Sequence, residues 1–144
     1  MEVKAVLLVE DNSTDEELTV RALKKSGIAM DISVARDGEE ALAHLLPNEP
    51  RPLPDLVLLD LKLPKVSGLD VLERLRANKH TQNLPVIVVS SSTKPEDVAA
   101  AYRLGCNGYM AKGVDYVQFV ESAKTLAQYW LLYNVPPVRE AGTA

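Results

Sequence analysis

Three runs of apolar residues in this sequence are each followed directly by side chains that carry oxygen. These side chains are Glu10 and Asp11 after residues 6–9, Asp60 after residues 56–59, and Ser90 after residues 86–89. A short apolar run that stops at polar residues is typical of a strand buried on both faces of a parallel sheet. Open α/β sheets bind their ligands at the carboxyl ends of such strands. We therefore expect three carboxylates and a hydroxyl group to meet in one site.

The carboxylates of this predicted site are the kind of ligand that Mg²⁺ prefers in proteins. Like charges held close together raise one another's pKa, so a divalent cation is needed to keep all of them ionised. Lys112 follows the short strand predicted at residues 108–111 and would bring an ammonium group to the same edge. A metal ion and an ammonium group around the Asp60 carboxylate favour phosphoryl transfer, which depends mostly on positioning and charge neutralisation.

Each of these residues also has a structural alternative. Asp11 could cap the helix expected after it, because acids are common at that position. Asp60 could belong to a turn, and Ser90 could be an ordinary hydroxyl at a strand end. Tyr109 could be a core aromatic, and Lys112 could be a solvated surface charge. The presence of the acids, the hydroxyl and the lysine together favours the functional interpretation.

Strands and helices alternate along the chain and would position this site. The sequence predicts strands at about residues 4–9, 32–34, 56–59, 86–89 and 108–111. It predicts helices that begin near residues 13, 37, 94 and 115, the last extending to about residue 133, and a third helix in chain order that carries Leu69, Leu72 and Leu75. Ser13 is the expected cap of the first helix, with Glu16 three residues later. Five strands alternating with five helices predict a parallel sheet with helices on both faces.

The bulk properties fit one globular domain over residues 1–144, with a C-terminal helix extension and tail from about residue 126. The net charge is −4, which argues against a nucleic-acid partner. Cys106 is the single cysteine, so an intramolecular disulfide is impossible and a reducing compartment is expected. The sequence shows no signal peptide and no run long enough to span a membrane, so we expect a cytoplasmic protein.

The segments that carry these residues resemble the signature of response-regulator receiver domains of two-component signalling. They are VLLVEDN, DLVLLDLKLPKVSGLDVL, LPVIVVSSS and GYMAK, in order over about residues 4–125. The resemblance implies a flavodoxin-like, doubly wound sheet of five parallel strands in the order 2-1-3-4-5. It also implies a phosphorelay in which a sensor histidine kinase transfers a phosphoryl group to Asp60 in a Mg²⁺-dependent reaction. Such a domain is a signalling phosphoprotein that catalyses only its own phosphorylation and dephosphorylation.

The resemblance assigns a role to each residue of the site. Mg²⁺ would be held by Glu10, Asp11, Asp60 and the backbone carbonyl group of Lys62. The phosphoryl group would be contacted by Lys112 and by the hydroxyl group of Ser90, and Tyr109 would be the rotating aromatic of the switch. Lys62 and Ser92 flank the position of an attacking water and are predicted to tune dephosphorylation. The switch would reshape the surface of the fourth helix, fifth strand and fifth helix.

Two positions depart from the usual pattern of the family. Glu10 stands where the family usually has aspartate, and this side chain can still bind a metal ion. Gly113 follows Lys112, where most receivers have a proline after a cis bond. A cis bond before a residue other than proline costs about 2.5–4 kcal/mol. Either a trans bond or a costly cis bond must therefore place the Lys112 loop.

The C-terminal stretch resembles receivers that pair with phytochrome-type sensor kinases. The residues that carry this resemblance are Asp115, Tyr116, Phe119, 129–133 and 135–137. One helical stripe that could dock on the sheet contains Tyr116, Val120, Ala123, Ala127 and Trp130. A second apolar stripe would be left over, which predicts a twofold homodimer through Leu126, Tyr129, Trp130 and Tyr133. The alternative is a tail that folds back over its own domain.

Two functions of other classes remain open at this stage. A phosphohydrolase that acts on small molecules through an aspartyl-phosphate would normally have a second acid two residues after the nucleophile and a cap domain. Lys62 occupies that position here, and no cap domain is evident. A degenerate receiver that works only as a dimeric adaptor would have no use for a complete acidic pocket.

Overall fold

A five-stranded parallel sheet in the order β2-β1-β3-β4-β5 forms the centre of the protein. The computed structural model describes residues 2–49, 51–113 and 115–137. The strands are β1 (Lys4–Val9), β2 (Met30–Ala35), β3 (Leu56–Leu59), β4 (Val86–Ser90) and β5 (Gly108–Ala111). The helices are α1 (Ser13–Lys24), α2 (Gly38–Leu45), α3 (Gly68–Ala77), α4 (Pro95–Arg103) and α5 (Tyr116–Gln128), followed by the π-helical segment η1 (Tyr129–Tyr133). The predicted flavodoxin-like fold is confirmed.

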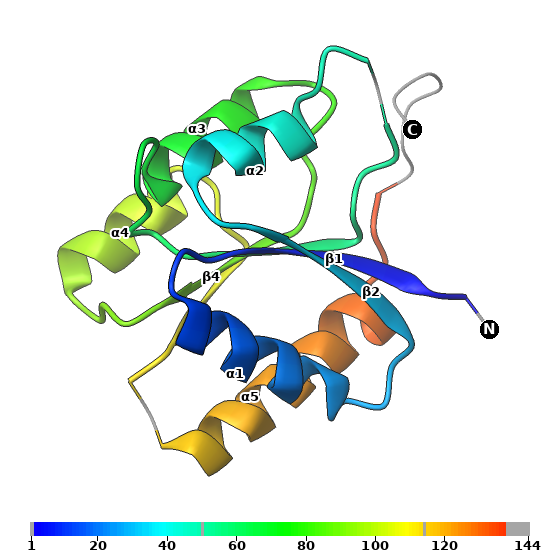
Figure 1. Cartoon of the computed structure of the whole chain (residues 1–144). Helices are drawn as coiled ribbons and strands as arrows, with labels where there is room; N and C mark the ends of the chain where they lie inside the picture. The colour runs from blue at the N-terminus through cyan, green and yellow to red at the C-terminus, as the bar shows by residue number, and fades with distance from the viewer. Residues whose placement is uncertain (1, 50, 114, 138–144) are drawn as a thin grey trace.

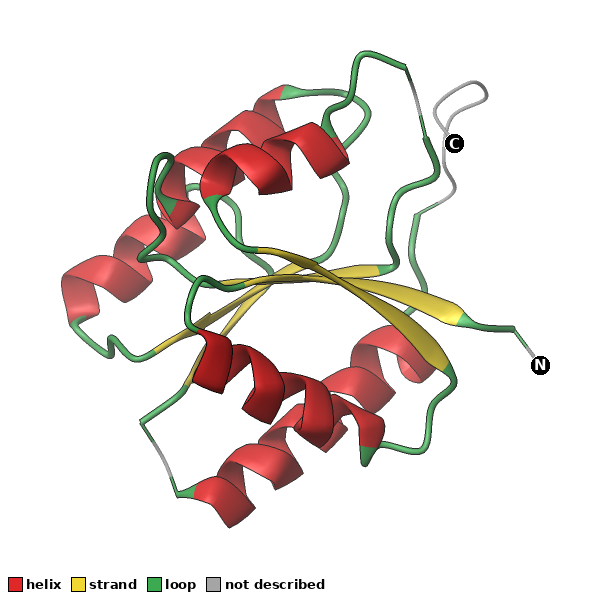
Figure 2. Cartoon of the chain, viewed as in Figure 1, coloured by secondary structure: helices red, strands yellow, loops and turns green. Residues whose placement is uncertain are grey.

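The sheet lies between two layers of helices, with α2, α3 and α4 on one side and α1 and α5 on the other (Figure 1). Figure 2 shows the strands stacked edge-on between these layers. Successive side chains of a strand point to opposite faces, so the strands contribute to both hydrophobic cores. Leu7 and Val57 pack with α2 and α3, whereas Leu8 and Leu58 pack with α1 and α5. Because both faces are covered, the central strands β1, β3 and β4 contain continuous apolar runs, whereas the edge strand β2 alternates in burial.

Four of the five α-helices begin with a side chain that accepts a hydrogen bond from an amide of the first turn. These N-cap residues are Asn12, Asp37, Ser67 and Asp115. Asn12, rather than the predicted Ser13, caps α1, and its Oδ1 accepts from the Asp15 amide at 2.9 Å. Asp11 is therefore not the cap of α1. Asparagine and serine are about equally good caps, so the sequence alone could not separate neighbouring candidates.

The C-terminal helix differs from the single α-helix predicted up to residue 133. The α-helical part ends at Gln128, and the last five residues form the wider turn η1. Phe119 and Leu131 are buried against the sheet, whereas Tyr116 is 41% exposed. The predicted docking stripe is therefore wrong at Tyr116, because the chain buries the aromatic ring three residues later and the wider turn brings Leu131 inward.

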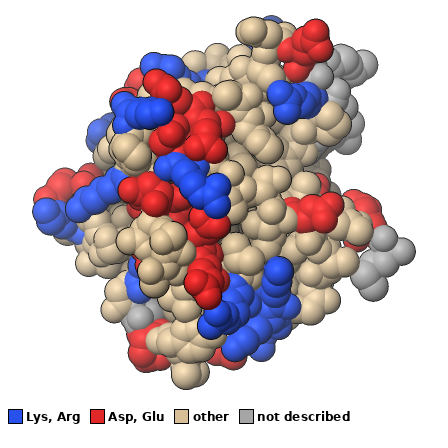
Figure 3. Space-filling view, in the orientation of Figure 1, with Lys and Arg blue, Asp and Glu red and all other residues tan. Residues whose placement is uncertain are grey.

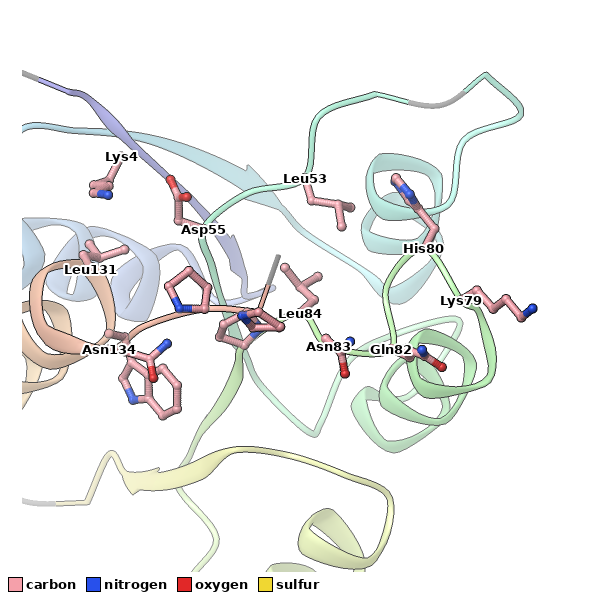
Figure 4. A pocket seen from close by; sticks show the side chains of 14 residues that line it. Lys4, Leu53, Asp55, Lys79, His80, Gln82, Asn83, Leu84, Leu131 and Asn134 are labelled. Carbon is pink, nitrogen blue, oxygen red and sulfur yellow. The ribbon is translucent and has the colours of Figure 1, made fainter. Parts of the chain in front are cut away.

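The tail lies against its own domain at the amino-terminal edge of the sheet. Tail residues, strand ends and the segment between α3 and β4 surround a cavity of about 450 Å³ there (Figure 4). Asn134 and Pro137 of the tail line the cavity together with Lys4 and Asp55. Part of the tail up to Pro137 therefore lies near its own domain, whereas Val135 is 88% exposed. No helix within the described part of the chain is long and apolar enough to cross a membrane.

Candidate functional site

The parallel register brings the predicted site residues to one edge of the sheet. Val9 pairs with Leu59, so Glu10 and Asp60 follow on neighbouring strands. Carboxylate oxygens of Glu10, Asp11 and Asp60 all lie within 4.8 Å of one another. Glu10 and Asp60 are buried, whereas Asp11 is exposed. The acids therefore form one pocket that opens to solvent on the side of Asp11.

Lys112 brings a cation into the acidic pocket from the end of β5. Its Nζ donates hydrogen bonds to Glu10 Oε1 at 2.5 Å, to Asp60 Oδ2 at 3.0 Å and to Asp15 Oδ2 at 3.1 Å. Burial lowers the pKa of Lys112, but the hydrogen bonds to Glu10 and Asp60 raise it more, so its pKa lies above the ordinary value. The peptide bond between Lys112 and Gly113 is trans, since no cis bond occurs among the described residues.

Asp15 is a member of the site that the sequence analysis missed. It lies in the first turn of α1, where an acid is commonplace because it favours the positive end of the helix. The signal that could have identified it is its place one turn after Asp11, in a helix that starts directly behind β1. Three carboxylates, those of Glu10, Asp15 and Asp60, thus contact the ammonium group of Lys112. The Asp11 carboxylate lies beside those of Glu10 and Asp60.

The electrostatics of the pocket favour a divalent cation. Burial raises the pKa of Glu10 to about 7, although the hydrogen bond from Lys112 opposes this shift. Figure 3 shows acidic side chains gathered in a band on the side of the molecule where α1 and α2 begin. The carboxylates lie close together, and the one positive charge of Lys112 does not balance their negative charge. Carboxylate oxygens arranged in this way suit Mg²⁺ or Mn²⁺ as ligands. The residues present therefore fit such an ion.

Close packing of α3 holds the loop that follows the central carboxylate. A Cβ atom added to Gly68 would lie 2.2 Å from the backbone oxygen of Asp60, so only glycine fits there. The Lys62 amide donates to Asp60 Oδ1 at 3.4 Å, and the Lys62 side chain is exposed. Lys65 has a φ of 68°, and its Nζ lies 3.6 Å from the carboxylate of Asp37 at the start of α2. The loop is thus fixed between two helices.

The hydroxyl and the aromatic predicted for the switch both contact the loop after β4. Ser90 is 1% exposed, and its Oγ accepts a hydrogen bond from the Ser92 amide at 3.2 Å. The hydroxyl group of Tyr109 donates to the Ser92 carbonyl oxygen at 2.7 Å. The Tyr109 ring also packs on the core beneath α2, α3 and α4. Tyr109 therefore combines core packing with a polar contact to the loop.

The predicted dimer residues differ in exposure. Tyr129 and Tyr133 are 49% and 70% exposed. Leu126 and Trp130 are half-buried against the core beneath α1 and α5, and the Trp130 ring meets the Tyr129 ring edge-on with centroids 5.2 Å apart. Leu132, which was not among the predicted dimer residues, is 54% exposed. The outer face of η1 is thus apolar and accessible.

Comparison with known proteins identifies the family. The response regulator receiver domain family matches residues 6–124. The chain belongs to this family. A receiver domain is a signalling domain of two-component systems rather than a conventional enzyme, and the carboxyl-edge pocket lies within the matched residues.

Several relatives of this receiver are known. Response regulator Rcp1 of Synechocystis sp. is 36% identical over 131 residues, which cover 89% of each protein. The probable methanogenesis regulatory protein FilR2 of Methanothrix harundinacea is 37% identical over 134 residues, which cover 92% of this chain and 86% of FilR2.

Solved structures extend the similarity to phytochrome-associated response regulators. The phosphorylated cyanobacterial phytochrome response regulator RcpA has a TM-score of 0.85 at 34% identity, covering 95% of this chain and 100% of RcpA. The Mn²⁺-bound form of Rcp1 has a TM-score of 0.83 at 35% identity, covering 94% of this chain and 99% of Rcp1.

Proposed function

We propose that this receiver accepts a phosphoryl group on Asp60 in a Mg²⁺-dependent reaction and thereby changes its surface. The observation that carries the proposal is the meeting of three carboxylates within 4.8 Å around Asp60, with the Lys112 ammonium group 3.0 Å from its Oδ2. A turn aspartate or an adaptor would need neither the neighbouring acids nor the lysine. The Mn²⁺-bound form of the relative Rcp1 lends support to a metal site in this pocket.

The chemistry begins with a phosphohistidine of a sensor kinase whose second ring nitrogen carries a proton. A carboxylate oxygen of Asp60 attacks the phosphorus atom, and the P–N bond breaks as the P–O bond forms. The bonding electrons return to the ring nitrogen, so the histidine leaves as neutral imidazole. Lys112 moves its hydrogen bonds from the carboxylates to the phosphoryl oxygens and neutralises part of their charge.

Mg²⁺, when bound, supplies the remaining charge neutralisation for the phosphoryl oxygens. The groups that we propose to hold it are Glu10, Asp11, Asp60 and the backbone carbonyl group of Lys62. The side chain of Lys62 is exposed beside this pocket. We propose that Lys62 and Ser92 tune dephosphorylation from their places next to Asp60 and Ser90, and unchanged decay after both are replaced would refute this role.

The new charge then acts on the loop after β4. The acyl phosphate carries about 1.5–2 negative charges, so the buried hydroxyl group of Ser90 turns toward it and Tyr109 reorients with the loop. Driving a switch from 1:99 to 99:1 takes about 5.5 kcal/mol. Two or three charge-assisted hydrogen bonds at roughly 1.5–3 kcal/mol each can supply that amount. The expected result is a changed surface on α4, β5 and α5.

A phytochrome-type histidine kinase is the partner that we propose for this receiver. The support is its similarity over nearly the whole chain to RcpA, a phytochrome response regulator. Transfer from purified phosphorylated kinases of the same organism tests this choice. The phytochrome-type kinase should transfer fastest, and a faster transfer from an unrelated kinase would contradict the assignment.

A twofold homodimer through the end of α5 and η1, with Leu126, Tyr129, Trp130 and Tyr133 at the interface, completes the proposal. Tyr133 is 70% exposed in an apolar segment, and exposed apolar surfaces of this kind commonly bind another protein. Tyr133→Ser should weaken the dimer in light scattering at low micromolar concentration. Val117→Ser, a matched change at the 71% exposed start of α5, should leave it unchanged. Equal behaviour of the two variants would refute this interface.

Intact-mass spectrometry after incubation with acetyl phosphate tests the phosphorylation itself. We expect the mass of one phosphoryl group to be added when Mg²⁺ is present and not when it is chelated. Asp60→Asn should stay unmodified. A chain that never gains the group would be an adaptor, and a chain that hydrolyses many small phosphate esters would be a phosphohydrolase.

A further inference from the structure

Ser92 connects the proposed switch residues to helix α4. It is a buried polar residue at 9% exposure. Its amide donates to Ser90 Oγ at 3.2 Å, and its carbonyl oxygen accepts from the Tyr109 hydroxyl group at 2.7 Å. Its own hydroxyl group donates to the Asp97 carboxylate and accepts from the Lys94 amide at 3.3 Å. One residue thus joins the strand-end hydroxyl, the aromatic ring and the first turn of α4.

The start of α4 is stabilised differently from the starts of the other α-helices. Its N-cap residue, Lys94, makes no side-chain cap hydrogen bond. Asp97 is the third residue of the helix, a position from which an acid commonly reaches back to the amide of the N-cap residue. Here the Ser92 hydroxyl group bridges the Asp97 carboxylate and the Lys94 amide: it donates to the carboxylate and accepts from the amide. The cap of α4 therefore belongs to the loop next to the phosphorylation site.

Helix α4 is also weakly anchored by packing. Ala101 is its one buried residue, whereas each of the other α-helices buries at least three. Tyr102 is 50% exposed on its outer side. Elements with few buried contacts have low local stability and are the ones that move. The position of the first turn therefore depends strongly on the hydrogen bond between Ser92 and Asp97.

We propose that Asp97 is a positioning residue that transmits the state of Ser90 to α4 through the Ser92 hydroxyl group. The proposal rests on phosphorylation at Asp60. When the Ser90 hydroxyl group turns toward the phosphoryl group, the Ser92 amide moves with it or loses its acceptor. Because the Ser92 hydroxyl group is bonded to Asp97, the first turn of the helix moves as well. Without that carboxylate the loop responds and the helix does not.

Amide hydrogen exchange by NMR on the full chain tests this coupling. The reporters are the amides of residues 97 and 98, which donate to the Lys94 carbonyl oxygen at 3.0 and 3.1 Å. Without any ligand, Asp97→Ala should raise their exchange about tenfold, as expected for loss of a charge-assisted hydrogen bond. Glu96→Ala removes an exposed acid from the same turn and should leave exchange unchanged. Asp97→Asn keeps an acceptor oxygen without the charge, so its exchange should lie between the wild type and Asp97→Ala.

The second arm adds Mg²⁺ and beryllofluoride, a phosphoryl analogue that binds carboxylates. In the wild type, exchange should change in residues 91–94 and also at residues 97 and 98, and Asp97→Ala should confine the change to 91–94. A response in Asp97→Ala that still reaches α4 would overturn the coupling, as would equal loosening by Glu96→Ala. A wild type that does not respond anywhere would count against phosphorylation at Asp60, and the ligand-free comparison would still decide whether Asp97 holds the helix.

Discussion

Replacing Lys112 by glutamine should destabilise the metal-free protein more than any other loss of a single lysine. The change removes the one ammonium group that contacts Glu10, Asp60 and Asp15, at distances of 2.5, 3.0 and 3.1 Å. The Lys112 side chain is 12% exposed, and those of Glu10 and Asp60 are 2% and 10% exposed. Breaking a buried ion pair of this kind costs about 3–5 kcal/mol, because charges are left uncompensated.

The size of the effect should depend on pH and on metal. For a domain of this length, about 3 °C of Tm is lost per kcal/mol, so Tm should fall by roughly 10–15 °C at pH 8. Near pH 5.5 a proton on Glu10 replaces the lost cation, because the pKa of Glu10 is already raised to about 7 by burial. The loss should therefore shrink at low pH. Mg²⁺ should raise the Tm of the variant more than that of the wild type.

Thermal unfolding followed by circular dichroism at both pH values measures these differences. Lys124→Gln is the matched control, since Lys124 pairs with Glu121 at 3.6 Å on the surface, where its side chain is 34% exposed. An exposed pair of this type is worth less than about 1 kcal/mol. Equal losses of Tm for the two variants at pH 8 would refute the electrostatic account of the pocket. A loss of Tm for Lys112→Gln that is the same at both pH values would also refute it.

Three further outcomes are expected. Gly68→Ala should cost several kcal/mol in urea unfolding and weaken Mg²⁺ binding, because its Cβ would meet the Asp60 carbonyl oxygen at 2.2 Å; wild-type values would exclude this close approach. Asp15→Asn should speed labelling by acetyl phosphate, since Lys112 would lose a competing partner, and slower labelling would contradict that role. Between pH 4.5 and 7 the folded protein holds a proton on Glu10 that the unfolded chain releases, so the free energy of unfolding of the metal-free protein should fall as pH rises over this range and through 7. Glu10→Gln should abolish this pH dependence in urea titrations. An unchanged pH dependence would show that it comes from another group.

The fold and the centre of the site follow from short-range features of the sequence. Strands buried on both faces leave continuous apolar runs, and the polar residue after each run is placed at the carboxyl edge by parallel pairing. Those two rules place Glu10 and Asp60 at the same edge. The strand order that the family resemblance implied makes them neighbours, and Val9 and Leu59 are register partners. The position of Lys112 at the same edge follows in the same way, because Lys112 comes directly after β5 and Ala111 of β5 pairs with Ser90 of β4.

Features that depend on how helices pack were not accessible to the same reasoning. Asp15 reaches Lys112 because the first turn of α1 packs beside the end of β5, 97 residues away in sequence. The bond between Ser92 and Asp97 depends on the path of the loop after β4. The wider turn from residue 129 has no local marker, since its residues are apolar and helix-compatible on every side. Such features arise from tertiary contacts rather than from local preference.

Mapping the phosphorylated position tests the central claim most directly. Borohydride reduces an aspartyl phosphate to homoserine, which marks the modified position in peptide mass spectrometry. After treatment with acetyl phosphate and Mg²⁺, homoserine should occur at residue 60 and at no other aspartate, including Asp11 and Asp15. A stable phosphoryl group on Ser90 or a histidine, or homoserine at another aspartate, would contradict the assignment of Asp60 as the acceptor.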